Sequence, residues 1–377
     1  MPEKTEKKTV LITGANGFLG RTLIAALENI AGLELLKYDI GNTFDELSKF
    51  AAKSDFVYHL AGVNRPKGPE EYESGNKGFT ERLAGLLKET GRKTPVLLSS
   101  TIQAVLENPY GLSKKGAEDA MRNYAEETGA NVCIYRLPNI FGKWCKPNYN
   151  SVVATWCYNL ARDLPIHINN PDTEFNLVYV DDVVEEFVNA LNGCENRGHD
   201  GFCTVSRSFH TSLGDLADRL YSFKDSGTTL VMPDLDPVFQ RFLYATYISY
   251  LPTEDLGYNL EMKQDHRGWL AEFIKSKSFG QIFISRTRPG ITRGNHWHNT
   301  KVEKFLVIDG TAVIKLRGVN ASDVAAYMVS GDKLKVIDIP AGYTHSITNV
   351  GESDVITLFW ADEIYDPGKP DTYFSEV

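Results

Sequence analysis

Four side chains late in the chain are of types that hold a divalent metal ion: His296, His298, Glu303 and His345. His296 and His298 would share one face of an extended strand, because side chains alternate along a strand with a period of two. Glu303 has the opposite parity, so the chain must turn at Asn299-Thr300 before the carboxylate can face the same point. Three imidazoles and one carboxylate suit zinc, iron, nickel or manganese, and we expect zinc. The alternative is a histidine-rich surface strand without a metal.

A second group of residues could reduce a carbonyl. Tyr110 and Lys114 are four residues apart, which places them on one face of a helix. A nearby ammonium and the ribose of a nicotinamide can lower the pKa of a phenol, so Tyr110 could pass a proton to a carbonyl oxygen while hydride reaches the carbon. The preceding apolar segment ends in Ser99-Ser100-Thr101, whose hydroxyls could hold the same carbonyl.

A third pattern, TGANGFLG, follows the apolar run TVLIT directly and carries Gly14, Gly17 and Gly20. Glycines at this position let the backbone approach a pyrophosphate, which rests on the N-terminus of the next helix. Asp39 follows Gly20 by 19 residues and is placed to accept hydrogen bonds from an adenosine ribose. The alternative for Asp39 is a solvated aspartate in a turn.

The elements that must position these residues divide the chain in two. Up to about residue 245, helical segments alternate with short apolar segments: TVLIT, LELLKY, DFVYHL, PVLLSS and NVCIYRL. This rhythm is typical of a doubly wound parallel sheet of the Rossmann type, with helices on both faces. After it, short strands with glycine turns predict an antiparallel all-β barrel. We therefore expect an α/β domain over residues 1–245 and an all-β domain over residues 246–377.

Composition narrows the class of protein. The 377 residues contain 42% hydrophobic residues, enough for two cores, and no stretch approaches the roughly 20 apolar residues of a membrane span. The net charge of −9 argues against nucleic-acid binding. The charged start MPEKTEKK leaves no room for a signal peptide, and five cysteines without a C-x-x-C pair favour a reducing cytoplasm.

The first half resembles an extended short-chain dehydrogenase/reductase through TGANGFLG, HLAG at 59–62, YGLSK, RLPNIFG at 136–142 and VYVDDVV at 178–184. The resemblance implies an NAD(P)H cofactor and the catalytic set Thr101, Tyr110 and Lys114. Thr101 and Tyr110 are unusually close in sequence, so the loop that often shapes the sugar pocket is truncated. The implied cofactor contacts are Gly14, Asn16, Gly17, Phe18, Leu19, Gly20, Asp39, Leu60, Ala61, Gly62, Tyr110 and Lys114. The matching region of such reductases holds a nucleotide sugar, which makes candidates of Asn139, Lys143, Lys146, Asn148 and Asn150.

The second half resembles a cupin, through G-x5-H-x-H-x4-E-x6-G followed by P-x-G-x2-H-x3-N. The segment near the start of this half, QDHRGWLAEF, resembles the D-x-R-G segment of cupin-type nucleotide-sugar epimerases. Arg267 is therefore a candidate substrate contact, and an ordinary strand ion pair is the equal alternative for Arg267 and Glu272.

Reductase followed by cupin resembles the CapF family of bifunctional enzymes of capsule and O-antigen synthesis. The likeness includes NRP at 64–66, FGKWCKPNYNSV, GNHWHNTKVEKFLV, GYTH and DPGKPDTYFSEV. It implies a UDP-linked 2-acetamido-2,6-dideoxy-4-keto hexose, epimerised at C3 by the cupin and reduced at C4 by the reductase. The product would be a precursor of UDP-N-acetyl-L-fucosamine.

The chemistry supports this division of labour. A 4-ketone acidifies the C3 hydrogen, so a base and an acid can invert C3, and reduction at C4 then traps one epimer. The sequence does not rank the candidate bases Lys301, Lys304, His266 and Tyr343. It also leaves open whether the metal supports the structure or acts as a Lewis acid.

Other readings of the whole chain also remain open. One is a single-activity reductase whose cupin serves dimerisation or sugar binding, and another is a non-enzymatic dinucleotide sensor. A metal-dependent oxygenase is a third. Asp39 would repel a 2′-phosphate, so we expect NADH to serve at least as well as NADPH. We also expect a homodimer.

Overall fold

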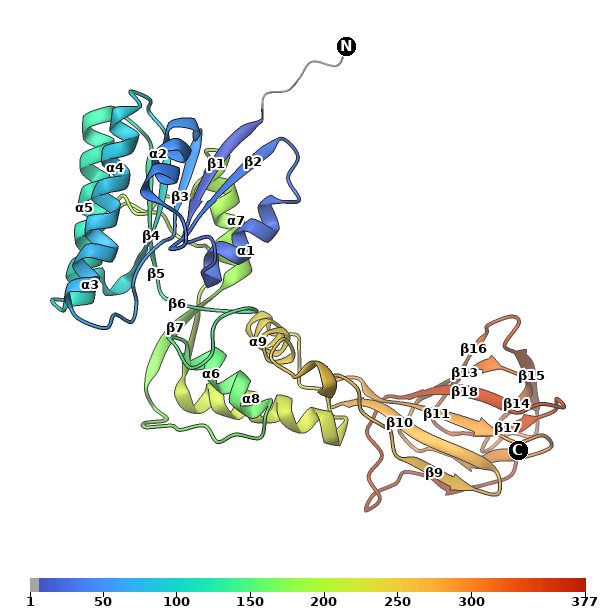
Figure 1. The fold of residues 1–377 in the computed structure, drawn as a ribbon. Helices are drawn as coiled ribbons and strands as arrows, with labels where there is room; N and C mark the ends of the chain where they lie inside the picture. Colours follow the sequence, from blue (N-terminus) through green and yellow to red (C-terminus); the bar gives the residue numbers. More distant parts are fainter. Residues whose placement is uncertain (1–6) are drawn as a thin grey trace, which may run out of the picture. The chain divides into compact units, whose positions relative to one another are not determined.

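The computed structural model describes residues 7–377, so the start of the chain at residues 1–6 lies outside the described residues. The chain forms two compact units (Figure 1). One contains the described residues up to Leu220 together with Phe242–Leu251, and the other contains Tyr221–Arg241 and Pro252–Val377. The domain boundary predicted near residue 245 falls inside helix α9 (Val238–Ile248) and stays a prediction.

The first unit is built on a parallel sheet of five strands in the order β2-β1-β3-β4-β5 (Figure 1). The strands are β1 (Lys8–Thr13), β2 (Leu33–Tyr38), β3 (Phe56–His59), β4 (Val96–Thr101) and β5 (Val132–Leu137). Val10 of β1 lies opposite Leu35 of β2 on one side and Phe56 of β3 on the other. Strands buried on both faces need near-continuous apolar sequence, which these segments have. The predicted doubly wound α/β fold is confirmed.

Helices cover both faces of this sheet (Figure 1). They are α1 (Phe18–Leu27), α2 (Phe44–Lys53), α4 (Phe79–Glu89), α5 (Pro109–Thr128) and α7 (Val180–Leu191). Leu23 of α1 and Phe187 of α7 share a core with Tyr58 of β3. Leu83 of α4 and Met121 of α5 belong to a second core on the opposite face. Because successive strand side chains point to opposite faces, one strand supplies both cores.

The remaining elements of the first unit follow the carboxyl ends of the sheet strands or extend beyond them. They are α3 (Glu70–Tyr72), the π-helical η1 (Glu73–Gly78), the 3-10 helix η2 (Ile102–Val105), α6 (Val152–Leu160) and a sheet of β6 (Asn139–Phe141), β7 (Glu174–Tyr179) and β8 (Phe209–Ser212). Helices α8 (Leu213–Thr229) and α9 each contain one boundary between the two units, and the third boundary follows Leu251. Within residues 7–377, no helix is both long and apolar enough to cross a lipid bilayer.

After Pro252 the second unit continues with the 3-10 helix η3 (Thr253–Asp255) and then forms two antiparallel sheets. Their orders are β16-β13-β18-β11-β10-β9 and β15-β14-β17-β12-β19. The strands are β9 (Met262–Asp265), β10 (Gly268–Ser276), β11 (Gly280–Thr287), β12 (Thr292–Trp297), β13 (Glu303–Asp309), β14 (Thr311–Gly318), β15 (Val324–Ser330), β16 (Val336–Ile339), β17 (Tyr343–Asn349), β18 (Val355–Ala361) and β19 (Tyr373–Phe374).

One apolar core holds these two sheets together. Phe305 and Phe359 come from the first sheet, and Ile314 and Ile347 come from the second. The core is filled by side chains at alternate positions of each strand, as expected when one face of a sheet is buried. The predicted all-β second half is confirmed.

Candidate active site and metal centre

The glycine-rich turn between β1 and α1 is closely packed. Gly14 has a φ of +71°, and a Cβ there would lie 2.7 Å from the amide nitrogen of Ala61. A Cβ on Gly20 would lie 2.2 Å from the carbonyl oxygen of Gly14. Only glycine fits at these two positions, so the turn can pass close to a ligand at the N-terminus of α1. Such a turn suits the pyrophosphate of a dinucleotide.

Asp39 lies against this turn. Its Oδ2 accepts a hydrogen bond from the backbone nitrogen of Asn16 at 2.7 Å, and its Oδ1 accepts one from that of Ile40 at 2.8 Å. Lys37, the nearest cation in sequence, instead pairs with Glu28 at 2.7 Å. The carboxylate therefore stands at the glycine-rich turn without neutralisation by Lys37.

A cavity of about 840 Å³ opens at the carboxyl ends of the parallel strands. This is where doubly wound folds bind their ligands. Residues predicted from the sequence that line it include Gly14, Asn16, Gly17, Phe18, Leu19, Gly20, Asp39, Leu60, Ala61, Gly62, Thr101, Tyr110, Lys114, Asn139, Lys146 and Asn150. The structure thus brings the predicted cofactor contacts and the predicted catalytic set into one cavity.

Helix α5 presents Tyr110 and Lys114 in its first turns. The helix begins sharply, because the Asn108 side chain accepts a hydrogen bond from the nitrogen of Gly111 at 2.8 Å and Pro109 occupies the first turn. Both functional side chains consequently sit at the end of the helix that faces the cavity.

Burial controls the proton affinities of both side chains. It raises the pKa of Tyr110, and the hydrogen bond with Thr101 offsets this only in part. It lowers the pKa of Lys114 to about 8, although Glu118 acts in the opposite direction. The Lys114 ammonium donates to the carbonyl oxygen of Ser99 at 2.8 Å. Burial is the largest influence on the pKa of Tyr110 in this structure, and the lowering of that pKa by Lys114 together with the cofactor ribose stays a prediction.

The hydroxyls at the end of β4 have separate partners. Ser100 donates to Glu118 at 2.5 Å, and Glu118 forms an ion pair with Arg136 at 2.6 Å. Glu118 is only 1% exposed, so its buried carboxylate needs this hydrogen bond. The Ser100 hydroxyl is therefore not free to hold a substrate carbonyl. Thr101, at the cavity and bonded to Tyr110, is the better placed hydroxyl.

A second cavity of about 560 Å³ adjoins the first, and Asn139 and Asn150 line both. Among the other predicted sugar contacts, Lys146 lines the first cavity and Asn148 lines the second. Lys143 is held in an ion pair with a carboxylate of α7 at 2.6 Å. The roles of these residues in sugar binding stay predictions.

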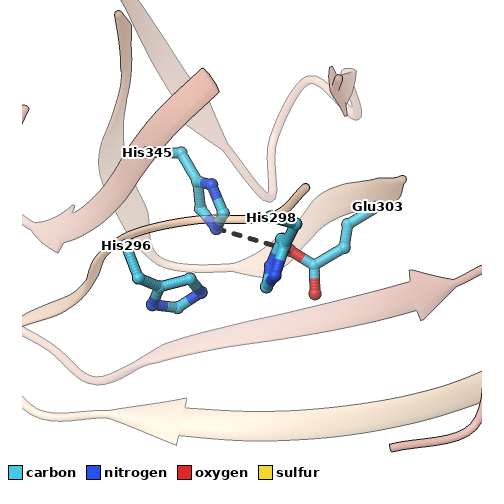
Figure 2. Close-up of side chains that lie close together, drawn as sticks. All are labelled: His296, His298, Glu303 and His345. Carbon is cyan, nitrogen blue, oxygen red and sulfur yellow. Dashed lines mark hydrogen bonds and ion pairs between the residues drawn. The ribbon is translucent and has the colours of Figure 1, made fainter. Parts of the chain in front are cut away.

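The four predicted metal ligands converge in the second unit (Figure 2). Their candidate ligand atoms all lie within 4.8 Å of one another. His296 comes from β12 and His345 from β17, while Glu303 begins β13 in the other sheet. His298 lies just beyond β12, and the turn expected at Asn299-Thr300 follows it.

A local feature of the backbone determines the position of these side chains. The register of β12 against β17 shifts between Gly294 and His296, so Asn295, with a φ of +57°, forms a bulge. The bulge places His296 directly opposite His345. Nε2 of His298 and Nε2 of His345 lie 3.1 Å and 3.3 Å from Oε2 of Glu303.

The protonation of the cluster suits a metal ion. Burial, reinforced by the neighbouring imidazoles, lowers the pKa of His296 to about 4. Burial acts to raise the pKa of Glu303, but the hydrogen bond from His298 and the adjacent His345 ring hold the pKa at about 2. Burial likewise acts to lower the pKa of His298, and Glu303 reverses this, so a metal would replace a proton there. Within the described chain, the buried Nε2 of His345 has no hydrogen-bond partner of good geometry, as expected of a ligand atom.

Four other candidates of the second unit are already paired. Lys301 is 5% exposed and donates to the carbonyl of Pro370 at 3.1 Å. Lys304 pairs with Asp338. Arg267 pairs with its neighbour Asp265 at 2.6 Å, as in the ion-pair alternative, and its role in binding substrate stays a prediction. Glu272 pairs with Lys275 at 2.8 Å.

Three residues at these sites did not stand out in the sequence. Asn64 accepts a hydrogen bond from the hydroxyl of Tyr110, and the buried Asn76 holds the loop beside it. Asp371 binds the turn that carries His298. The NRP and DPGKPDTYFSEV segments contain two of these residues, but only the fold shows what they contact.

Comparison with known proteins agrees with both units. Residues 10–202 match the model of the NAD dependent epimerase/dehydratase family, and residues 263–373 match that of the Polysaccharide biosynthesis C-terminal domain. The chain is 42% identical over 368 residues, 98% of each chain, to UDP-2-acetamido-2,6-beta-L-arabino-hexul-4-ose reductase of Pseudomonas aeruginosa. The solved structure of CapF, a capsular polysaccharide assembling protein of Staphylococcus aureus, has a TM-score of 0.92 and 47% identity, covering 98% of this chain and 100% of that one.

A more distant structure, UDP-glucose 4-epimerase of Thermotoga maritima, has a TM-score of 0.54 and 20% identity, covering 64% of this chain and 98% of that one. This likeness concerns the fold alone. The dinucleotide cavity and the family match together define an NAD-dependent enzyme of the epimerase/dehydratase class. Similarity over nearly the whole chain then narrows the assignment: the chain belongs to the CapF family.

Proposed function

We propose that this protein acts twice on a UDP-2-acetamido-2,6-dideoxy-4-keto hexose. The second unit would epimerise C3, and the first unit would reduce the C4 ketone with NAD(P)H, towards UDP-N-acetyl-L-fucosamine for capsule or O-antigen. The observation that carries the proposal is the convergence of Thr101, Tyr110 and Lys114 on the cavity that also contains the glycine-rich turn. The name of the Pseudomonas relative supports the same sugar class.

The first unit has what a ketone reduction requires. A bound dihydronicotinamide supplies the hydride. Tyr110 keeps its proton at neutral pH, because burial raises its pKa, and can therefore give it to the carbonyl oxygen. Thr101 is placed to hold that oxygen. Lys114, with a pKa lowered to about 8, can exchange protons near neutral pH and supports the return of a proton to the site.

The second unit supports C3 epimerisation less directly. Its histidine and glutamate cluster suits one divalent metal ion, and we propose zinc because three imidazoles and a carboxylate are common zinc ligands. A bound metal would stabilise the fold or polarise the ketone. The base remains unassigned among Lys301, Lys304, His266 and Tyr343, and the pairing of both lysines favours neither of them.

A single-activity reductase is the second candidate. Four protein ligands, three of them buried, are typical of a closed structural zinc site. In that case the second unit would bind sugar or support dimerisation without changing C3.

One experiment separates the two candidates. The purified protein is incubated in D2O with the UDP-4-keto sugar, first without cofactor and then with NADH or NADPH. The bifunctional proposal expects deuterium at C3 before cofactor is added, and cofactor oxidation afterwards. Cofactor oxidation without exchange at C3 supports the single-activity reductase. If the protein catalyses neither reaction, both candidate functions are contradicted.

We also propose a homodimer in a reducing cytoplasm. The edge strands β15 and β16 expose large apolar side chains, including Met328 at 66% and Val336 at 52% exposure. Exposed apolar edge strands are typical of surfaces that pair with another chain. All five cysteines are free, which suits a reducing compartment.

A further inference from the structure

The loop that follows β3 contacts the catalytic tyrosine directly. The Tyr110 hydroxyl donates a hydrogen bond to Oδ1 of Asn64 at 2.9 Å, and Thr101 bonds the same hydroxyl from the end of β4. We propose that Asn64 is a positioning residue of the ketone reduction, which holds the Tyr110 hydroxyl until the substrate carbonyl replaces it. This inference rests on the reductase function proposed above.

A buried amide fixes the loop that carries Asn64. Asn76, in η1, is 2% exposed and exchanges two hydrogen bonds with the backbone of Val63, at 2.8 Å and 3.1 Å. Its amide nitrogen also donates to the hydroxyl of Ser113 at 2.9 Å. Ser113 in turn donates to the carbonyl of Tyr110 at 2.8 Å. One side chain therefore ties the residue before Asn64 to the first turn of α5.

This double attachment explains why the contact is defined in space. A buried amide that lost any of these partners would pay its full desolvation cost, so the loop and the helix are held in one arrangement. The π-helical turn that carries Asn76 is also a rare form, found frequently at functional sites. The Asn64–Tyr110 hydrogen bond itself lies at the exposed surface of the cavity, but the backbone on each side of it is held by this buried network.

A carboxamide suits a positioning role because its oxygen accepts a hydrogen bond without taking the proton. During reduction, hydride from the cofactor forms the new C4–H bond and the carbonyl π electrons move to oxygen. The Tyr110 O–H bond then breaks as its proton moves to that oxygen, and solvent returns a proton to Tyr110. An acceptor on the neutral phenol favours the protonated form, which is the form that donates. A carboxylate at position 64 would hold the proton more tightly.

Other groups also act on Tyr110 and must stay constant in a test. Tyr72 of α3 lies with its ring centroid 5.5 Å from that of Tyr110, and Tyr149 comes from the loop before α6. Lys114 lies one turn along α5, with its ammonium on the Ser99 carbonyl. Each of these side chains is retained when only Asn64 is replaced.

The kinetic test compares wild type with Asn64→Ala. We expect kcat for C4 reduction to fall about fivefold with KM little changed, as for one lost neutral hydrogen bond. The alkaline limb of the pH profile should move to lower pH, because the phenol loses its proton more readily. Asn29→Ala is the matched control, since the side-chain amide of Asn29 donates to the carbonyl of Ala25, away from the cavity lining. Unchanged kcat and an unchanged pH profile in Asn64→Ala would overturn the inference.

A measurement without turnover separates this inference from the proposed function. In protein labelled with 13C at the tyrosine ζ carbon, the resonance missing from Tyr110→Phe belongs to Tyr110. Its titration midpoint should fall in Asn64→Ala, rise in the near-isosteric Asn64→Asp and stay constant in Asn29→Ala. If the wild type reduces no UDP-4-keto sugar but these midpoints still move, the proposed reductase function is refuted, while the hydrogen bond between Asn64 and Tyr110 is supported. Midpoints that do not move in either Asn64 variant contradict the positioning role.

Discussion

Nδ1 of His298 donates a hydrogen bond to the main-chain carbonyl of Asp371, at 2.6 Å. The carboxylate of Asp371 then accepts hydrogen bonds from the backbone nitrogens of Asn299, Thr300 and Lys301 at 2.9–3.1 Å. Asp371 thereby fixes both the ring of one predicted metal ligand and the turn that follows it. Partners of this kind orient imidazoles and raise their affinity for metal.

Replacing Asp371 should therefore weaken metal binding. In Asp371→Ala the turn loses its acceptor, and we expect affinity for zinc to fall about tenfold or more, the usual effect of losing an outer-sphere partner. Competition with a chromophoric chelator measures it. Asp366→Ala is the control, because Asp366 lies in the same segment but accepts from Gly368. Equal affinities in the two variants would mean that Asp371 does not support the site.

The removal of a ligand should have a larger effect. His345→Ala or His296→Ala should lose most of the bound metal and lower the unfolding temperature of the second unit, because the remaining ligands become buried and unpaired. The first unit has its own cores and should unfold as before. Elemental analysis and calorimetry test both points, with His266→Ala as the control. Full metal content in the ligand variants would refute the assignment.

Tyr110→Phe should separate the two proposed reactions. Loss of the proton donor should lower kcat/KM for cofactor oxidation by about 100-fold or more. Solvent deuterium should still enter the sugar at C3, because enolisation is assigned to the other unit. Mass spectrometry of the sugar and absorbance of the cofactor measure the two rates. A folded variant that lost both reactions would contradict the division of labour.

Local spacing was sufficient to predict much of both sites. The glycine-rich turn, the pair Tyr110 and Lys114, and the parity of His296 and Glu303 all depend on residues close in sequence. They therefore follow from the periodicity of helices and strands. The structure places all of them as these patterns predicted.

Contacts between distant segments were not predictable in this way. Asp371 is 73 residues from His298, and Asn64 is 46 residues from Tyr110, so only the fold shows that they meet. The bulge at Asn295 was also missed, since one extra residue in a strand leaves little trace in a sequence. The effect of burial on the pKa of Tyr110 is likewise a tertiary property, which local spacing does not indicate.

The choice of cofactor tests the role of Asp39. Its carboxylate lies at the glycine-rich turn, 2.7 Å from the nitrogen of Asn16, and Lys37 is paired with Glu28. A 2′-phosphate there would meet a like charge, so we predict that NADH serves at least as well as NADPH. Asp39→Ala should shift the ratio of kcat/KM values towards NADPH by about tenfold or more.

Arg82 of α4 is one of the cations that line this cavity, and its side chain has no hydrogen bond or ion pair within the described residues. Arg82→Ala is therefore the matched variant, with kcat/KM measured for both cofactors in each protein. A strong preference of the wild type for NADPH would contradict the prediction. Loss of that preference in Arg82→Ala would then show that the guanidinium binds the 2′-phosphate and outweighs the repulsion from Asp39.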